Sequence, residues 1–181
     1  RQWGREKPHG KSLWWPVVAR NKKSITVNLR LEEGQEIIRN LIKSTDILIE
    51  NFRPGTLERW GIGYDVLSKI NPQLVMVRVS GYGQTGPYAS RAGFGAIGEA
   101  MGGLRYVSGD PSTPPSRMGI AIGDQLAAMH ACIGALMALH VRKRTGKGQV
   151  VDSAIYESVL NMMESLVTEH DVAGYTRERT G

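Results

Sequence analysis

The chain has 181 residues, 41% of them apolar, which suits one globular domain with a substantial core. A single cysteine, Cys132, excludes an internal disulfide and a zinc site built on cysteine pairs. The net charge of +6 suits an anionic partner, but the basic residues are scattered and not interleaved with aromatic residues, so we expect no nucleic-acid binding. No window holds the run of about 18 apolar residues typical of a membrane helix, so we expect no membrane span and a cytoplasmic location.

The first half of the chain alternates between strand and helix patterns. Period-two alternation and short branched apolar runs predict strands at residues 24–29, 46–50 and 74–79. Helical spacing predicts helices over 31–43 and 56–70, the second broken early by Gly61 and Gly63. This order predicts an α/β fold with a parallel sheet, right-handed crossovers and flanking helices.

The second half of the chain is richer in small residues. A glycine-rich loop at 81–87 precedes a small-residue helix predicted over 94–103. Nearly every position from 125 to 141 is apolar, which predicts a helix buried on all sides. A short strand at 149–152 and an amphipathic helix over 153–169 are expected to follow.

The two ends of the sequence look interrupted. The chain begins at Arg1 rather than at a methionine, and it stops after a long helical pattern without a finishing element. We therefore expect residues 1–181 to be a single-domain fragment of a longer protein.

Asp124 opens the apolar helix expected over 125–141, and two interpretations stay open for it. Aspartate is a common N-cap, because its carboxylate accepts hydrogen bonds from the free N–H groups of the first turn. Alternatively, Asp124 is a nucleophile: its reference pKa of about 3.9 keeps it ionised at neutral pH, and a carboxylate can attack an activated acyl group to form a mixed anhydride.

Two loops follow predicted strands at their carboxyl ends, where ligands of open parallel sheets bind. Residues 50–55 form either such a site or a plain turn in which Asn51 caps the next helix and Pro54 and Gly55 bend the chain. The glycines of residues 81–86 would let a substrate approach the backbone closely, although the segment matches neither a Walker loop nor a dinucleotide fingerprint.

The four histidines show no metal-ligand spacing. Glu169, His170 and Asp171 are adjacent, but neighbouring residues on a helix point in different directions. We expect no metal site.

Five segments together resemble the class III CoA-transferases, the family of formyl-CoA and carnitine CoA-transferases. These segments are residues 21–25, 50–55, 80–87, 123–124 and 145–152. The resemblance spans nearly the whole chain and implies a Rossmann-like open sheet within a larger ring-shaped chain that forms an interlocked homodimer. It also implies a glycine-rich lid C-terminal to Gly181.

The resemblance implies transfer of CoA from an acyl-CoA, with succinyl-CoA as the expected donor, to a free carboxylic acid. Asp124 matches the family's catalytic aspartate, which carries the acyl group as an anhydride and CoA as a thioester. CoA is a substrate here, and no permanently bound cofactor is implied. The residues implied to contact CoA are Val27, Arg30, Asn51, Phe52 and Arg59, with Arg53 and Tyr82 as neighbours; arginines suit phosphates and an aromatic surface suits adenine.

Two alternatives remain. A related 2-methylacyl-CoA racemase uses a His-Asp pair where this chain has Phe94 and Gly95, neither of which can move a proton. A non-catalytic acyl-CoA binding protein would keep the basic strand ends without depending on Asp124.

Overall fold

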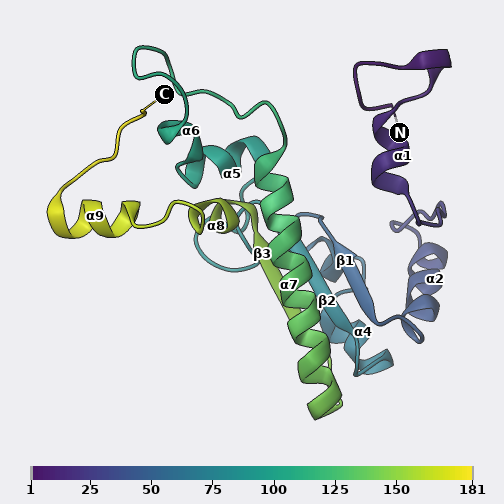
Figure 1. Cartoon of the computed structure of the whole chain (residues 1–181). Helices are drawn as coiled ribbons and strands as arrows, with labels where there is room; N and C mark the ends of the chain where they lie inside the picture. The colour runs from purple at the N-terminus through teal and green to yellow at the C-terminus, as the bar shows by residue number, and fades with distance from the viewer. Residues whose placement is uncertain (1, 181) are drawn as a thin grey trace.

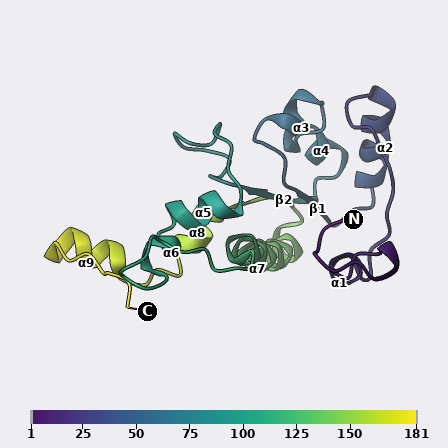
Figure 2. The same cartoon turned by 90° about the horizontal axis from the view of Figure 1, so that it is seen from above.

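The computed structural model describes residues 2–180 and has three layers, with helices on both faces of a small sheet (Figures 1 and 2). A 3-10 turn at Pro8–Gly10 precedes the first helix. The helices are α1 (Trp14–Ala19), α2 (Glu32–Ile42), α3 (Thr56–Arg59), α4 (Tyr64–Ile70), α5 (Gly95–Met101), α6 (Leu104–Val107), α7 (Ile122–Thr145), α8 (Ile155–Leu160) and α9 (Leu166–Ala173). The strands are β1 (Ile47–Glu50), β2 (Val75–Ser80) and β3 (Val150–Ala154).

The three strands form one parallel sheet in the order β1-β2-β3, which confirms the parallel α/β architecture. Ile47 pairs with Val75 in the first ladder, and Met76 pairs with Val150 in the second. Because all the strands run the same way, their carboxyl ends lie at one edge of the sheet. The loops after β1 and β2 therefore meet there.

The central strand β2 is buried on both faces. Met76 joins a cluster with Ile42, Leu57, Ile62, Leu67 and Leu74, which packs α2, α3 and α4 on one face of the sheet. Val75 and Val77 point to the other face and pack against Ala131, Ala135 and Ala138 of α7. Figure 2 shows α3 and α4 on one side of the sheet and α7 on the other. The apolar run of β2 is thus explained by burial on both sides.

The strand expected at residues 24–29 is wrong. The segment is not helical, but it joins no sheet within residues 2–180, and Ile25 is exposed. Its alternating pattern predicts a strand only if a partner strand supplies hydrogen bonds, and this segment packs against α2 instead. The carbonyl oxygen of Asn28 lies 2.0 Å from where a Cβ on Gly34 would be, so the glycine permits this close contact.

Three of the expected helices are shorter than their apolar patterns. The pattern over 56–70 divides into α3 and α4, as Gly61 and Gly63 predict, and Gly61 adopts a left-handed φ of 64°. The pattern over 94–103 gives α5, which ends before Gly102 and Gly103. The pattern over 153–169 begins as strand β3 and continues as two helices, α8 and α9, separated at 161–165. Apolar spacing alone did not locate these breaks.

Helix α7 is not buried on all sides, contrary to the prediction. Its alanine face packs on the sheet, whereas Met129, Ile133, Leu136 and Met137 are all more than half exposed. By length and hydropathy alone α7 would pass as a membrane-spanning helix, the single one found in the part of the chain that the structure describes. A core helix of a globular domain passes the same test, so the absence of a membrane span stays a prediction.

The two ends of the chain lie away from the sheet. Helix α1 is at one end of the molecule and α9 at the other, and Figure 1 shows α9 beyond α5, α6 and α8. Helices α5, α7 and α8 pack against one another beside the sheet. This helical group carries Asp124 next to the strand ends.

Candidate active site

A small cavity lies at the carboxyl ends of β1 and β2. Its volume is about 50 Å³, and it is lined by Asn51, Phe52, Arg53, Pro54, Ser80, Gly81, Tyr82, Ala89, Arg91 and Gly93. Two of the predicted CoA contacts, Asn51 and Phe52, therefore come together with their two predicted neighbours, Arg53 and Tyr82. Parallel strands explain this, because the two loops leave the sheet at the same edge.

Aromatic rings and arginines surround this cavity. Phe52 makes an edge contact with Trp60, with ring centroids 5.3 Å apart. Tyr82 lies between Tyr88 and Tyr156, at centroid distances of 5.5 and 5.8 Å. The Arg91 guanidinium lies 4.2 Å from the centre of the Tyr88 ring. Flat apolar surfaces beside cationic groups suit a ligand that combines an aromatic base with phosphates.

The glycine-rich loop is fixed at both ends. A Cβ on Gly81 would lie 2.4 Å from the Cα of Gly93, so two backbone segments pass each other at this point. Gly83 has a left-handed φ of 84°, and the Gln84 N–H donates to Asp152 Oδ2 at 2.7 Å. The loop is thus held between β3 and the segment that leads to α5.

Asp124 is the third residue of α7 and not its N-cap, which is Ala121. The capping interpretation is therefore wrong. The carboxylate lies against Gly95, the first residue of α5: a Cβ on Gly95 would be 2.5 Å from Oδ2. Gly95 is two residues from Gly93, which lines the small cavity. The carboxylate is thus connected to the strand-end cavity through one short segment.

The surroundings of Asp124 favour its neutral form. Partial burial raises the pKa of the Asp124 carboxyl, the negative charge of Glu99 raises it further, and Arg117 opposes both. Glu99 is fully buried on α5 and pairs with Arg105, whose Nε lies 3.4 Å from Oε2. Asp124 is therefore a more basic carboxylate than an exposed aspartate.

Val27, Arg30 and Arg59 do not line the small cavity. The Val27 side chain faces Gly34 of α2, and the Arg30 N–H donates to Asn28 Oδ1 at 3.1 Å. The Arg59 guanidinium donates to Thr56 Oγ1 at 3.0 Å on its own helix. Their contacts with CoA stay predictions.

Sequence reasoning missed an ion-pair cluster that includes Glu50, the neighbour of the cavity residue Asn51. Arg78 of β2 contacts Glu50 of β1 and Glu58 of α3. Burial alone would raise the pKa of Glu58, but hydrogen bonds and the charge of Arg78 outweigh it, so this pKa lies below its usual value. An arginine inside the apolar run 74–79 was the available signal, because a buried charge needs a partner.

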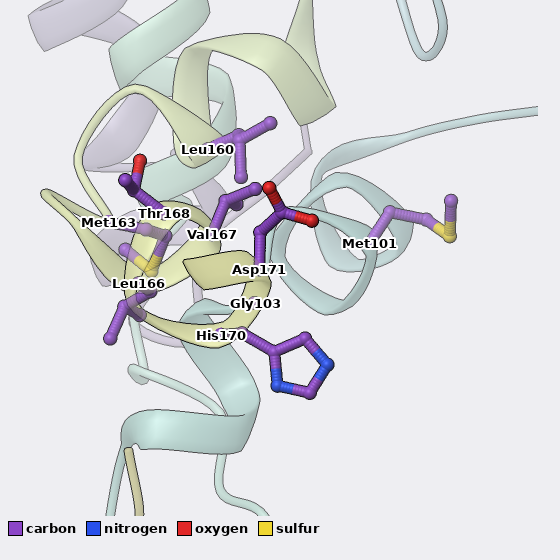
Figure 3. Close-up of a pocket in the computed structure, with 10 residues that line it drawn as sticks. Met101, Gly103, Leu160, Met163, Leu166, Val167, Thr168, His170 and Asp171 are labelled. Carbon is purple, nitrogen blue, oxygen red and sulfur yellow. The ribbon is translucent and has the colours of Figure 1, made fainter. Parts of the chain in front are cut away.

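Within residues 2–180, no three side chains of the His, Cys, Asp and Glu types come together as metal ligands. A larger cavity of about 540 Å³ lies elsewhere, between α5 and the α8–α9 segment, and is mainly apolar. Figure 3 shows Met101 on one side of it and Leu160, Met163 and Val167 on the other. It contains none of the predicted site residues.

The fold and the site define an α/β protein with a candidate ligand site at the carboxyl edge of a parallel sheet and a carboxylate of raised pKa near it. The model of CoA-transferase family III matches residues 1–181, and the chain belongs to this family.

Relatives and solved structures agree with this assignment. The chain is 59% identical over its whole length to a succinyl-CoA–D-citramalate CoA-transferase of Chloroflexus aurantiacus, of which it covers 45%. It is 47% identical to the beta subunit of a succinyl-CoA–L-malate CoA-transferase of the same organism, again covering 45%. A crystal structure of a CaiB/BaiF family protein from Brucella suis superimposes with a TM-score of 0.92 at 35% identity, covering all of this chain and 49% of that one. The chain thus spans about half the length of the relatives it matches.

Proposed function

We propose that the protein transfers CoA from an acyl-CoA to a free carboxylic acid, with Asp124 as the nucleophile. The observation that carries this proposal is the Asp124 carboxylate, which lies against Gly95 next to the strand-end cavity. The two relatives described above are both named as CoA-transferases, which supports the proposal.

The proposed reaction proceeds through two covalent states of Asp124. Its carboxylate oxygen attacks the thioester carbonyl, a C–O bond forms, the C–S bond breaks, and CoA leaves as the thiolate. The thiolate then attacks the aspartyl carbonyl, releasing the donor acid and leaving an aspartyl-CoA thioester. The acceptor carboxylate then attacks the aspartyl-CoA thioester, which forms a new anhydride and releases the CoA thiolate. The thiolate attacks the acceptor carbonyl of this anhydride, so the acceptor leaves as its CoA thioester and Asp124 returns as a free carboxylate. No net proton transfer or redox step is required.

The electrostatics around Asp124 suit this role. A carboxylate with a raised pKa is a stronger base and nucleophile once ionised, and Glu99 and partial burial both raise this pKa. The anhydride must be protected from water, because water would hydrolyse it. A segment outside residues 2–180 is proposed to cover the site during the reaction.

We propose succinyl-CoA as the donor and a hydroxylated dicarboxylic acid as the acceptor. Two relatives are named for succinyl-CoA together with citramalate or malate. The arginines at the cavity, Arg53 and Arg91, are compatible with anionic groups of either substrate.

The residues beside Asp124 argue against a racemase, because they include no acid–base side chain at positions 94 and 95. Gly95 lies directly against the carboxylate and provides no group that exchanges a proton, and neither does Phe94. The transferase mechanism needs no such group.

A cytoplasmic homodimer is also proposed, as part of a larger ring-shaped chain that interlocks with its partner. The support is the apolar outer face of α7, where Ile133, Leu136 and Met137 are exposed. A face of this kind typically packs against protein in the complete assembly.

The test is covalent labelling of Asp124 in the full-length protein. Incubation with succinyl-CoA followed by hydroxylamine should convert the acylated or thioesterified aspartate to a hydroxamate, detected by mass spectrometry on the peptide containing Asp124. Asp124→Ala should lose the label while retaining CoA binding. Retained CoA binding in the wild type with no adduct from several acyl-CoA donors would instead identify a binding protein.

A further inference from the structure

A charged cluster joins three elements and includes Glu50, which precedes the cavity residues Asn51 and Phe52. Arg78 Nε donates to Glu50 Oε1 at 2.7 Å, Arg78 Nη1 to Glu58 Oε1 at 2.7 Å, and Arg78 Nη2 to Glu58 Oε2 at 3.2 Å. Glu50 and Arg78 are also paired in the ladder between β1 and β2. We call Glu50, Arg78 and Glu58 the anchor cluster.

Two members of the anchor cluster are buried. The side chains of Glu50 and Arg78 are 3% and 10% exposed, whereas that of Glu58 is 45% exposed. Burying charges requires removing their water, and well-packed apolar residues often give equal or better stability at such positions. The cluster is therefore poorly explained by stability alone.

Each carboxylate of the anchor cluster is bonded to, or adjacent in sequence to, a cavity residue or a predicted CoA contact. The second oxygen of Glu50 accepts a hydrogen bond from the Phe52 N–H at 2.8 Å, which fixes the turn after β1. Glu58 precedes Arg59 on α3, and Trp60, at the end of the same helix, contacts the Phe52 ring. A bidentate arginine holds a carboxylate in one plane, so Arg78 sets the position of α3 relative to the sheet.

We propose that the anchor cluster positions the Phe52 turn and α3 as one preformed surface for the nucleotide part of CoA. This inference rests on the proposed function, since it assigns residues to the binding of the same substrate. Glu50, Arg78 and Glu58 are positioning residues, because they act through Phe52 and Arg59 and do not touch the ligand themselves. Preorganisation lowers the cost of ordering the site when ligand binds.

The chain offers a matched control at the opposite end of the same strand. Asp46 precedes β1, and its Oδ1 lies 2.9 Å from Arg142 Nη2 on α7. This ion pair also joins the edge of the sheet to a helix, but it is far along the strand from the cavity. Asp46→Asn therefore removes the charge of another carboxylate that pairs with an arginine, at a more exposed position and without touching the proposed CoA surface.

The experiment compares Glu58→Gln, Arg78→Lys and Asp46→Asn in the full-length protein. Coenzyme A affinity is measured by calorimetry, KM for succinyl-CoA and kcat by steady-state kinetics, and folding by circular dichroism and thermal melting. Glu58→Gln is the mild variant, since Glu58 is partly exposed. Arg78→Lys keeps the charge but loses the bidentate geometry.

We expect both cluster variants to weaken CoA affinity and raise KM about three- to tenfold, with kcat within about twofold of wild type. Asp46→Asn should leave the CoA affinity, KM and kcat unchanged. If Glu58→Gln lowers the melting temperature but leaves CoA affinity and KM at the Asp46→Asn values, the cluster is only structural and the inference is wrong.

The outcomes also separate this inference from the proposed function. A wild type that binds CoA but never labels Asp124, with weakened binding in the cluster variants, supports the anchor cluster and refutes the transferase. A wild type that labels Asp124, with unchanged CoA affinity in both cluster variants, supports the transferase and refutes the role of the anchor cluster. A wild type that neither binds CoA nor labels Asp124 overturns both.

Discussion

Gly95→Ala tests how the structure places the proposed nucleophile. The new Cβ would lie 2.5 Å from Asp124 Oδ2, 2.9 Å from Cγ and 3.0 Å from Oδ1, all closer than ordinary van der Waals contact. The carboxylate must therefore rotate or shift by about 1 Å. A misplacement of that size typically costs about 100-fold in rate, because the attacking oxygen leaves its line of approach to the thioester.

Gly95→Ala should affect activity far more than stability. Alanine is a better helix former than glycine by at most about 1 kcal/mol inside a helix, but Gly95 is the first residue of α5 and displacing the carboxylate offsets the gain. We therefore expect kcat to fall about 100-fold while the melting temperature and CoA affinity remain near wild type. The rate of Asp124 labelling, followed by quenched-flow mass spectrometry, should fall with kcat.

Ala100→Ser provides the control, because Ala100 is exposed on the same helix. It should change neither kcat nor the labelling rate. Labelling of Gly95→Ala at the wild-type rate would show that Gly95 does not determine the position of the nucleophile.

Two further predictions concern stability. Burial and Glu99 raise the pKa of Asp124 in the folded protein, so the folded state binds this proton more tightly than the unfolded state. The stability that Asp124 contributes therefore falls as pH rises from its unfolded-state pKa through its raised folded-state pKa. Asp124→Asn should therefore raise the melting temperature at pH 7 by about 1–2 °C, and the gain should disappear below about pH 4; an equal gain at both pH values would contradict this. Gly148→Ala would place a Cβ 1.9 Å from the Leu74 carbonyl oxygen, a backbone atom that cannot rotate away, so urea unfolding should show a loss of about 1–3 kcal/mol. An unchanged free energy of unfolding would show that the turn before β3 can open without cost.

Local patterns in the sequence were sufficient for the elements whose burial is uniform. The branched runs at 46–50 and 74–79 form β1 and β2, and in β2 the apolar run matches burial on both faces, whereas Ile49 of the edge strand β1 is exposed. The segment 24–29 has an equally good strand pattern and still forms no strand in the described residues, since a strand needs a neighbour whose N–H and C=O groups face its own. Similarly, the apolar run of α7 does not reveal which of its faces the sheet covers.

The residue types of the candidate site followed from the sequence. The loops at 50–55 and 81–86 were placed at strand ends because parallel strands share one carboxyl edge, and Asp124 stood out as an ionised group at the start of an apolar helix. Their relative positions were decided by tertiary structure alone. The contact of Asp124 with Gly95 joins α7 to α5, and the bonds of Arg78 to Glu50 and Glu58 join three elements across 28 and 20 positions of the chain. Such contacts depend on how helices pack on the sheet, so no local pattern encodes them, and they set the position of the carboxylate and the shape of the surface at the strand ends.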